Sequence, residues 1–194
     1  MAGNSVATIS SGKPKATGGI LVAPTTAVLP VGTDTAFAAT FAKLGYVGED
    51  GVQPGGERSV EEKRDWAGDV IANLQSGHSS KFSFTLLAVF DPDVLKQVFG
   101  PNNVTVTPPT TTSGTKIVVT EDGSDLPFNA WGFDMVTGVK KQRLVVPNGQ
   151  LTAVEELPFV SSDLQGFTVT LDCYKDSAGF KVYRYYDDGK FTAV

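Results

Sequence analysis

The residues best suited to nucleophilic chemistry in this chain are its single cysteine, Cys173, and its single histidine, His78. A nucleophilic thiol needs a neighbouring base and surroundings that stabilise the thiolate, whereas a buried thiol is inert. Cys173 occupies an apolar position of a predicted strand, and no G-x-S-x-G turn accompanies His78 to support a Ser-His-Asp triad. We therefore expect no catalytic residue, and we interpret His78 as a loop residue between two strands.

Groups that could bind a metal or a nucleotide are equally sparse. A zinc site needs several Cys or His ligands, and the chain has one of each. Asp91 and Asp93 could begin a calcium loop, but no further ligands follow, and a helix-capping role explains both. Gly12-Lys13 lacks the earlier glycine and the following Ser or Thr of a phosphate loop, and the glycines of 48–56 do not spell a dinucleotide fingerprint. We expect no metal site and no cofactor.

Paired acids and exposed aromatic residues suggest two other kinds of site. Glycoside hydrolysis needs two carboxyl groups facing one cleft, but Glu155 and Glu156 are adjacent on a predicted strand and face opposite sides. Several aromatic side chains could stack against a sugar, although such residues more often pack within sheets or at interfaces. They are Trp66, Trp131, Tyr183, Tyr185 and Tyr186. We predict that the protein is not an enzyme; a carbohydrate-binding β-sandwich remains open as an alternative.

One short helix stands out among predicted strands. The apolar run that begins at Lys81 breaks at Asp91-Pro92, where Asp91 can cap a helix and Pro92 suits its first position. Gly100 and Pro101 then end the helix. Strands are predicted at Ile20–Pro24, Phe41–Val47, Ser59–Trp66, Val70–Gln75, Lys81–Phe90, Val104–Thr107, Thr115–Thr120, Phe128–Met135, Val139–Val146, Gln150–Glu156, Phe167–Tyr174 and Phe180–Tyr186. This density of strands predicts a mainly β fold, a sandwich or a barrel, with one flanking α-helix.

The clearest alternation of apolar and polar residues lies in the last two predicted strands. Phe167, Val169, Leu171 and Cys173 alternate with polar residues, so one face of this strand belongs to the core. The segment 175–179 contains a glycine and separates this strand from the next, which predicts a β-hairpin. In the second strand of that hairpin, we expect Phe180, Val182, Arg184 and Tyr186 to share a face.

The remaining segments predict one domain with two extensions. At 194 residues the chain is long enough for a single all-β domain, which we place at residues 20–194. Residues 1–19 have the composition of an N-terminal arm without a core of its own. The glycine-rich stretch 48–66 is predicted to be a long loop, and loops of that length are usually functional or interfacial.

The charge distribution argues against a protein that holds nucleic acid. The net charge is −5, whereas sequence-independent DNA binders cluster Lys and Arg against phosphates. Acids dominate 49–69 and bases dominate 136–150, so these segments could pair within or between subunits. No secretory signal and no apolar stretch of membrane-spanning length is evident, so we expect a soluble protein made without export and no membrane partner.

Three segments, in this order, resemble a known family. They are GYVGEDGVQPGGERSVEEKRDWAGDVI, KFSFTLLAVFDPDVLKQVFG and GFTVTLDCYKDSAGFKVYRYYDD. Together they resemble the major tail protein, or tail-tube subunit, of long-tailed bacteriophages, in a style closest to phages of actinobacteria. The resemblance covers the chain from about Leu44 to Asp188.

The resemblance implies a structural virion protein of the phage tail, made in the host cytoplasm. Its β-sandwich or barrel-like domain would form hexameric rings that stack into a hollow tube, with the N-terminal arm and the 48–66 loop reaching neighbouring rings. The lumen would hold the tape-measure protein and the genomic DNA without specific DNA binding, and other tail proteins would meet the tube ends. Other virion ring components, a tail terminator or a capsid decoration, remain alternatives.

A conduit for DNA should not grip phosphates, because each Lys or Arg contact adds affinity that retards passage. We therefore expect a polar or acidic lumen lining. Two sets of strand residues could supply it: Gln150, Thr152 and Glu156, or Thr168, Thr170 and Asp172.

Overall fold

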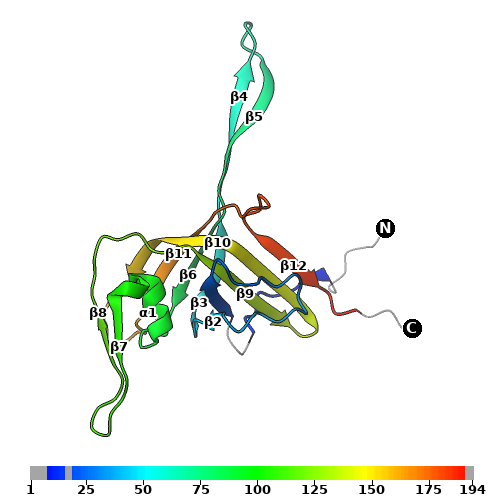
Figure 1. The fold of residues 1–194 in the computed structure, drawn as a ribbon. Coiled ribbons are helices and arrows are strands. Elements are labelled where there is room, and N and C mark those ends of the chain that lie inside the picture. Colours follow the sequence, from blue (N-terminus) through cyan, green and yellow to red (C-terminus); the bar gives the residue numbers. More distant parts are fainter. Residues whose placement is uncertain (1–7, 16–18, 191–194) are drawn as a thin grey trace.

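A computed structural model describes residues 8–15 and 19–190 (Figure 1). The described part is mainly β, with a single α-helix, as predicted. The elements are β1 Ile20–Pro24, β2 Ala42–Lys43, β3 Val47–Gly55, β4 Arg58–Arg64, β5 Val70–His78, β6 Lys81–Leu86, α1 Pro92–Phe99, the 3-10 turn η2 Pro101–Asn103, β7 Val104–Thr107, β8 Lys116–Val119, β9 Asn129–Thr137, β10 Lys140–Glu156, β11 Phe167–Cys173 and β12 Tyr183–Asp187.

The helix begins and ends where the sequence predicts. The Asp91 side chain accepts a hydrogen bond of 2.9 Å from the backbone N–H of Asp93 and so satisfies one of the free donors of the first turn. Gly100, at φ +94°, follows the last helical residue. Val94, Leu95 and Val98 are buried on one side, so α1 covers an end of the core beside β7, β8 and β10 (Figure 1).

Eight antiparallel strands form one main sheet in the order β2-β1-β9-β10-β11-β6-β3, with β12 also paired to β10. The sheet curls strongly around its core. The rings of Phe82 in β6 and Phe133 in β9 lie 5.2 Å apart, although the two strands are three places apart in the sheet. In a flat sheet that separation is roughly 14 Å. The curled sheet stays open, since no described residue joins β2 to β3.

The longest strand, β10, was predicted as two strands but is continuous from Lys140 to Glu156. It bends through register shifts after Val146 and after Leu151, and thereby belongs to both halves of the curled sheet. Gly149 lies at the first bend, where a Cβ atom would stand 2.9 Å from Leu171 Cδ1 and 3.0 Å from Trp131 Cδ1. A glycine at this position lets β10 cross the core without displacing either side chain.

The alternation predicted in β11 is confirmed, because Phe167, Val169, Leu171 and Cys173 are all buried. The predicted hairpin of β11 with β12 is wrong. β11 pairs with β10 on one edge and with β6 on the other, so it has no edge left for β12. β12 instead pairs antiparallel with residues 141–145 of β10 and so runs in the same direction as β11. Phe180 and Tyr186, which were expected to share a face, are both exposed.

The stretch 48–66 is not a loop, because it contains nearly all of β3 and the whole of β4. The strand that was also predicted at Ser59–Trp66 corresponds to β4. β3 pairs with β6, and the first pairs of β4 with β5 continue that register before it shifts within the hairpin, so 47–86 is one long two-stranded ribbon (Figure 1). The glycines that suggested a loop accommodate a bulge at Gly51 (φ +67°) and the kink at Gly56 (φ +127°). The strand predicted at Phe41–Val47 shrinks to the two residues of β2.

A smaller apolar cluster lies outside the main core. It comprises Leu21, Ala23, Phe41 and Ala130, with Phe37 and neighbouring residues of the loop 25–41 packed against it. The Phe37 ring rests on Gly132 of β9, where a Cβ atom would lie only 2.3 Å from the ring. This loop therefore covers part of the sheet, whereas β6 and β11 keep a polar face without such a cover.

Candidate assembly surfaces

The residues considered for chemistry do not form a common site in the folded chain. Cys173 is 4% exposed, and burial, with Asp172 as a second cause, raises the pKa of its thiol to about 12. His78 is the exposed last residue of β5 and lies opposite Arg58 in the ladder with β4, so its interpretation as a loop residue is wrong. Within 8–15 and 19–190, no group of three or more His, Cys, Asp or Glu side chains could hold a metal ion. The aromatic residues considered for sugar stacking also lie apart, since Trp131 is buried in the core and Trp66 is fully exposed.

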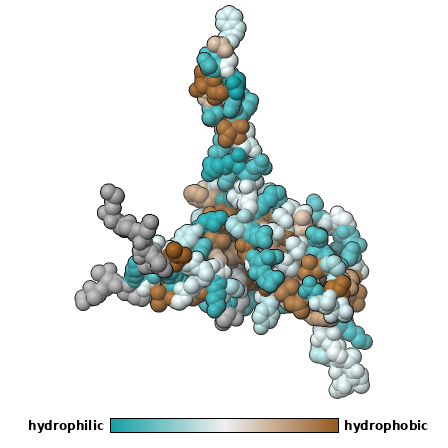
Figure 2. All heavy atoms as spheres, turned by 180° about the vertical axis from the view of Figure 1, so that it is seen from behind, coloured by the Kyte–Doolittle hydropathy of each residue, from teal (hydrophilic) through white to brown (hydrophobic). Residues whose placement is uncertain are grey.

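A projecting hairpin, β4 with β5, extends from the body as the outer part of the long ribbon (Figure 1). Almost all of its residues are exposed, including apolar ones that Figure 2 shows as patches along its length. The large exposed apolar residues are Val60, Trp66, Val70, Ile71 and Leu74. Apolar side chains gathered on an extension that buries nothing in its own subunit indicate an interaction surface.

The tip of the projecting hairpin has a defined shape. The Asp65 carboxylate accepts a hydrogen bond of 2.9 Å from the Asp69 N–H, and the Asp65 carbonyl accepts one of 3.1 Å from the Gly68 N–H. Arg64 donates to the Gly68 carbonyl at 3.0 Å. These bonds fix the turn that carries Trp66 outward, so the tip presents a large aromatic side chain to a partner at a small cost in conformational entropy.

Besides the outer edges of β2 and β12, two edges of the main sheet have no partner among the described strands. β3 pairs only with β6 among the described strands, so its other edge is free. β9 accompanies β10 only as far as Gly149, so residues 152–156 pair with β11 on one side and with no described strand on the other. Rows of unpaired backbone N–H and C=O groups are templates for another chain.

Between these open edges, β6 and β11 present a polar face. Thr168, Thr170 and Asp172 alternate with the buried residues of β11 and lie opposite Thr85, Ser83 and Lys81 of β6. The hydroxyl oxygens of Thr85 and Thr168 are 2.9 Å apart, and Lys81 forms an ion pair of 3.1 Å with Asp172. The face is therefore rich in hydroxyl groups and its lysine charge is compensated.

The two residue sets expected to line a lumen thus have different surroundings. Thr168, Thr170 and Asp172 lie together on the polar face. The other set is dispersed: Gln150 donates to the Leu126 carbonyl at 2.7 Å, and Thr152 falls at the register shift of β10. Glu156 borders a hollow of about 310 Å³ whose lining includes Phe90, Phe99 and Phe159.

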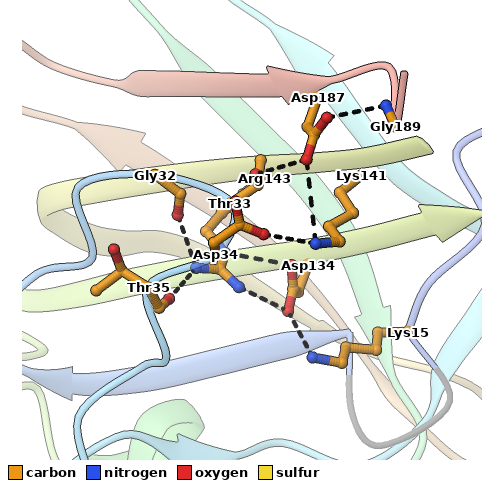
Figure 3. A network of polar contacts seen from close by, with 10 residues as sticks. All are labelled: Lys15, Gly32, Thr33, Asp34, Thr35, Asp134, Lys141, Arg143, Asp187 and Gly189. Carbon is orange, nitrogen blue, oxygen red and sulfur yellow. Dashed lines mark hydrogen bonds and ion pairs between the residues drawn. The ribbon is translucent and has the colours of Figure 1, made fainter. Parts of the chain in front are cut away.

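A charged network fastens the loop 25–41 to the sheet (Figure 3). Buried Arg143 forms two hydrogen bonds with Asp134, of 3.1 and 3.2 Å, and also donates to the carbonyls of Gly32 and Thr35. Beside it, Lys141 forms an ion pair with Asp34. That hydrogen bond lowers the pKa of the Asp34 carboxyl and raises the pKa of Lys141.

This network replaces the pairing that the charge distribution suggested within a subunit. Arg143 and Lys141, two bases of 136–150, pair with acids outside 49–69. Within 49–69, Glu61 pairs with Lys63 and Glu62 with Arg64, all on the projecting hairpin. The sequence could not reveal these partners because loop 25–41 meets β10 only in the folded chain.

The described part of the expected N-terminal arm lies on its own subunit. Residues 8–15 follow the end of β9. The backbone N–H of Lys15 donates to the Asp134 carbonyl and the backbone N–H of Val136 donates to the Lys13 carbonyl, both at 2.9 Å. The remainder of that arm, 1–7 and 16–18, falls outside the described residues.

Comparisons with known proteins bear on what these surfaces serve. No curated protein matches the chain. One similar solved structure is the tube-terminating cap of the anti-feeding prophage, with a TM-score of 0.46 and 10% identity over 92% of this chain and 95% of that one. Another is a chain of the PVC sheath-tube complex, an extracellular contractile injection system in its extended state, with a TM-score of 0.45 and 12% identity over 94% of this chain and 98% of that one. No helix in the described residues is long and apolar enough to cross a membrane. The family model described as phage tail tube protein matches residues 1–193, and this chain therefore belongs to that family and is a structural component of the virion tail.

Proposed function

We propose that this chain is the tail-tube subunit itself, whose copies form hexameric rings that stack into a hollow tube conducting phage DNA into the host. The observation that carries the proposal is the four-strand stretch β10-β11-β6-β3, which has open outer edges and a polar face. A subunit with two such edges completes its backbone hydrogen bonds beside copies of itself. The number six follows from the resemblance seen in the sequence.

The directions of the strands suit ring closure. Neighbouring strands are antiparallel throughout β10, β11, β6 and β3, so β3 runs opposite to β10. When copies are related by rotation about one axis, the β3 edge of one copy lies antiparallel to the 152–156 edge of the next. Each ring would then contribute a closed wall of strands, and closure removes the open edges.

The polar face of β6 and β11 is the surface that we assign to the lumen. Its hydroxyl groups are uncharged, and Lys81 is already paired with Asp172. Such a lining offers no unpaired lysine to a phosphate, so it adds little electrostatic affinity and leaves DNA free to slide. The same lumen would hold the tape-measure protein before DNA enters, and other tail proteins would meet the tube ends.

The projecting hairpin is the element that we assign to contact between rings. Its exposed apolar residues gain burial only when another subunit covers them, and Trp66 is carried at its outermost turn. Aromatic anchors of this kind contribute most of the binding energy at many interfaces.

Negative-stain electron microscopy of the purified full chain tests the proposal. We expect rings with an open centre and tubes formed by their stacking. A matched variant replaces residues 59–77 with Asn-Gly, a two-residue turn that suits the pair Arg58 and His78. This variant should form rings but no tubes. Dispersed single particles from the unaltered chain, at every concentration tried, would refute a tube subunit.

The lumen assignment has a separate test in phage particles. Thr170→Lys adds an unpaired positive charge to the polar face, so we expect normal tails but a reduced infective titre, because DNA delivery slows. Thr170→Asn is the neutral control. Equal titres of the two variants, with equal tail numbers, would contradict the assignment of this face to the lumen.

A further inference from the structure

The outer edge of β9 is covered by two separate parts of the chain. β1 pairs with β9 as far as the pair of Ile20 with Phe133, and the Asp134 N–H then donates to the Gly19 carbonyl at 2.9 Å. Beyond this point the backbone of residues 134–137 would be open. Residues 9–15 cover it, with a bridge between Pro14 and Met135 and the backbone hydrogen bonds of Lys15 and Val136.

Side chains add a second set of bonds to this contact. Thr137 donates through its hydroxyl to the Ser11 carbonyl at 2.7 Å, and the hydroxyl oxygens of the two residues are 3.1 Å apart. Lys140 donates to the Ile9 carbonyl, and Lys15 lies 3.4 Å from the Asp134 carboxylate. The contacts of residues 9–15 therefore run along the end of β9 and reach Lys140, the first residue of β10.

The segment contributes little to the core. All residues from Ile9 to Lys15 are exposed, so what the contact supplies is mainly backbone hydrogen bonds rather than apolar burial. Its middle reads Lys13-Pro14-Lys15, and lysine and proline are the residues with which natural sheets keep an edge from pairing further. A proline has no N–H to offer a strand that approaches from outside.

We infer that residues 9–15 guard the β9 edge within their own subunit and keep 134–137 closed to other chains. The consequence of this inference rests on the proposed function: with the β9 edge closed, assembly is directed to the β3 edge and the 152–156 edge. An open β9 edge would offer a further template, and pairing there would not continue the wall of strands described above.

A disulfide tests whether the guard stays in its own subunit during assembly. Ser11→Cys with Thr137→Cys places two thiols where hydroxyl oxygens now lie 3.1 Å apart. We expect an oxidised chain that runs as a monomer on non-reducing gels and forms tubes like the unaltered protein. Ser10→Cys with Thr137→Cys is the matched control and should cross-link far less. Cross-linked dimers from assembled tubes, or failure of the locked chain to assemble, would overturn the inference.

Deletion of the segment that covers the β9 edge provides an independent test in solution. A chain lacking residues 1–15 should remain folded by circular dichroism, yet form irregular associations whose size grows with concentration. A synthetic peptide of residues 8–15 should reduce this association at least several-fold, measured by light scattering. A truncated chain that forms only regular tubes like those of the full chain, seen by negative-stain electron microscopy, would overturn the inference. An unaltered chain that forms no tubes would instead overturn the proposed function, whatever the truncated chain does.

Discussion

The two ends of the ribbon 47–86 are both antiparallel strand pairs but have opposite surroundings. At the base, Phe82, Phe84 and Leu86 of β6 are buried against the core. In the projecting hairpin, Ile71 and Leu74 of β5 are exposed. β6 also pairs with β11 on its other edge, whereas β5 pairs only with β4 among the described strands, so both side-chain burial and backbone pairing tie the base to the body.

This difference separates folding from assembly along one pair of strands. An isolated two-stranded ribbon is at best marginally stable in water, so the projecting hairpin depends on its anchored base. The apolar residues that it exposes contribute little to the stability of the subunit and become useful only when a partner buries them. Substitutions at the base should therefore change unfolding, and substitutions in the projecting hairpin should change association.

The largest effect is expected for Leu86→Ala at the base. Leu86 is 0% exposed, and truncation of a fully buried leucine leaves a cavity that costs about 3–5 kcal/mol. Urea unfolding followed by fluorescence measures this loss. A change below about 1 kcal/mol would show that the base of the ribbon is not part of the cooperative core.

A smaller effect is expected for Gly56→Ala, at the kink between the base and the projecting hairpin. Gly56 has φ +127°, and an added Cβ atom would lie 2.4 Å from the Ser79 carbonyl oxygen. We expect a loss of about 1–3 kcal/mol in unfolding free energy, together with faster amide exchange in β4 and β5. Gly114→Ala, where the added atom meets nothing within 4 Å, is the control and should change neither quantity.

Leu74→Ala makes the same substitution as Leu86→Ala at the other end of the ribbon. Leu74 is 52% exposed, so the unfolding free energy should change by no more than about 0.5 kcal/mol. Tube formation should nevertheless require a higher protein concentration, as measured by sedimentation. Equal losses of stability for the two leucine variants would contradict the separation of folding from assembly.

The last prediction, with the smallest expected change in stability, compares the reactivity of two thiols toward a labelling reagent. Burial raises the pKa of Cys173 from 9.0 to about 12, so its contribution to stability is complete below pH 9 and is lost as the pH rises through 12. At pH 8, Cys173 should react with a thiol reagent only upon unfolding, whereas a cysteine introduced by Ser76→Cys in the projecting hairpin should react at once. Rapid labelling of Cys173 in the folded protein would contradict a closed core at β11.

Several features of the fold were predictable because their signals are local. The Asp91 cap, Pro92 and the pattern of buried residues fixed α1, and strict alternation fixed the buried face of β11. The glycines of 48–66 misled the prediction, since a bulge and a kink within paired strands need the same residues as a loop. Partner choice was also hidden, because β6 occupies the edge of β11 that a hairpin with β12 would need, and β12 pairs with β10 instead.

By itself, the sequence determined the mainly β class, the single capped helix, the shortage of groups for catalysis and the family resemblance, because these depend on residue type and short-range order. Only the tertiary structure decided which edges stay open, that Thr168, Thr170 and Asp172 share a polar face with β6, and that Lys141 pairs with Asp34. The physical reason is that strand pairing joins segments far apart in the chain, and many pairings satisfy the same alternation until competing strands occupy the edges.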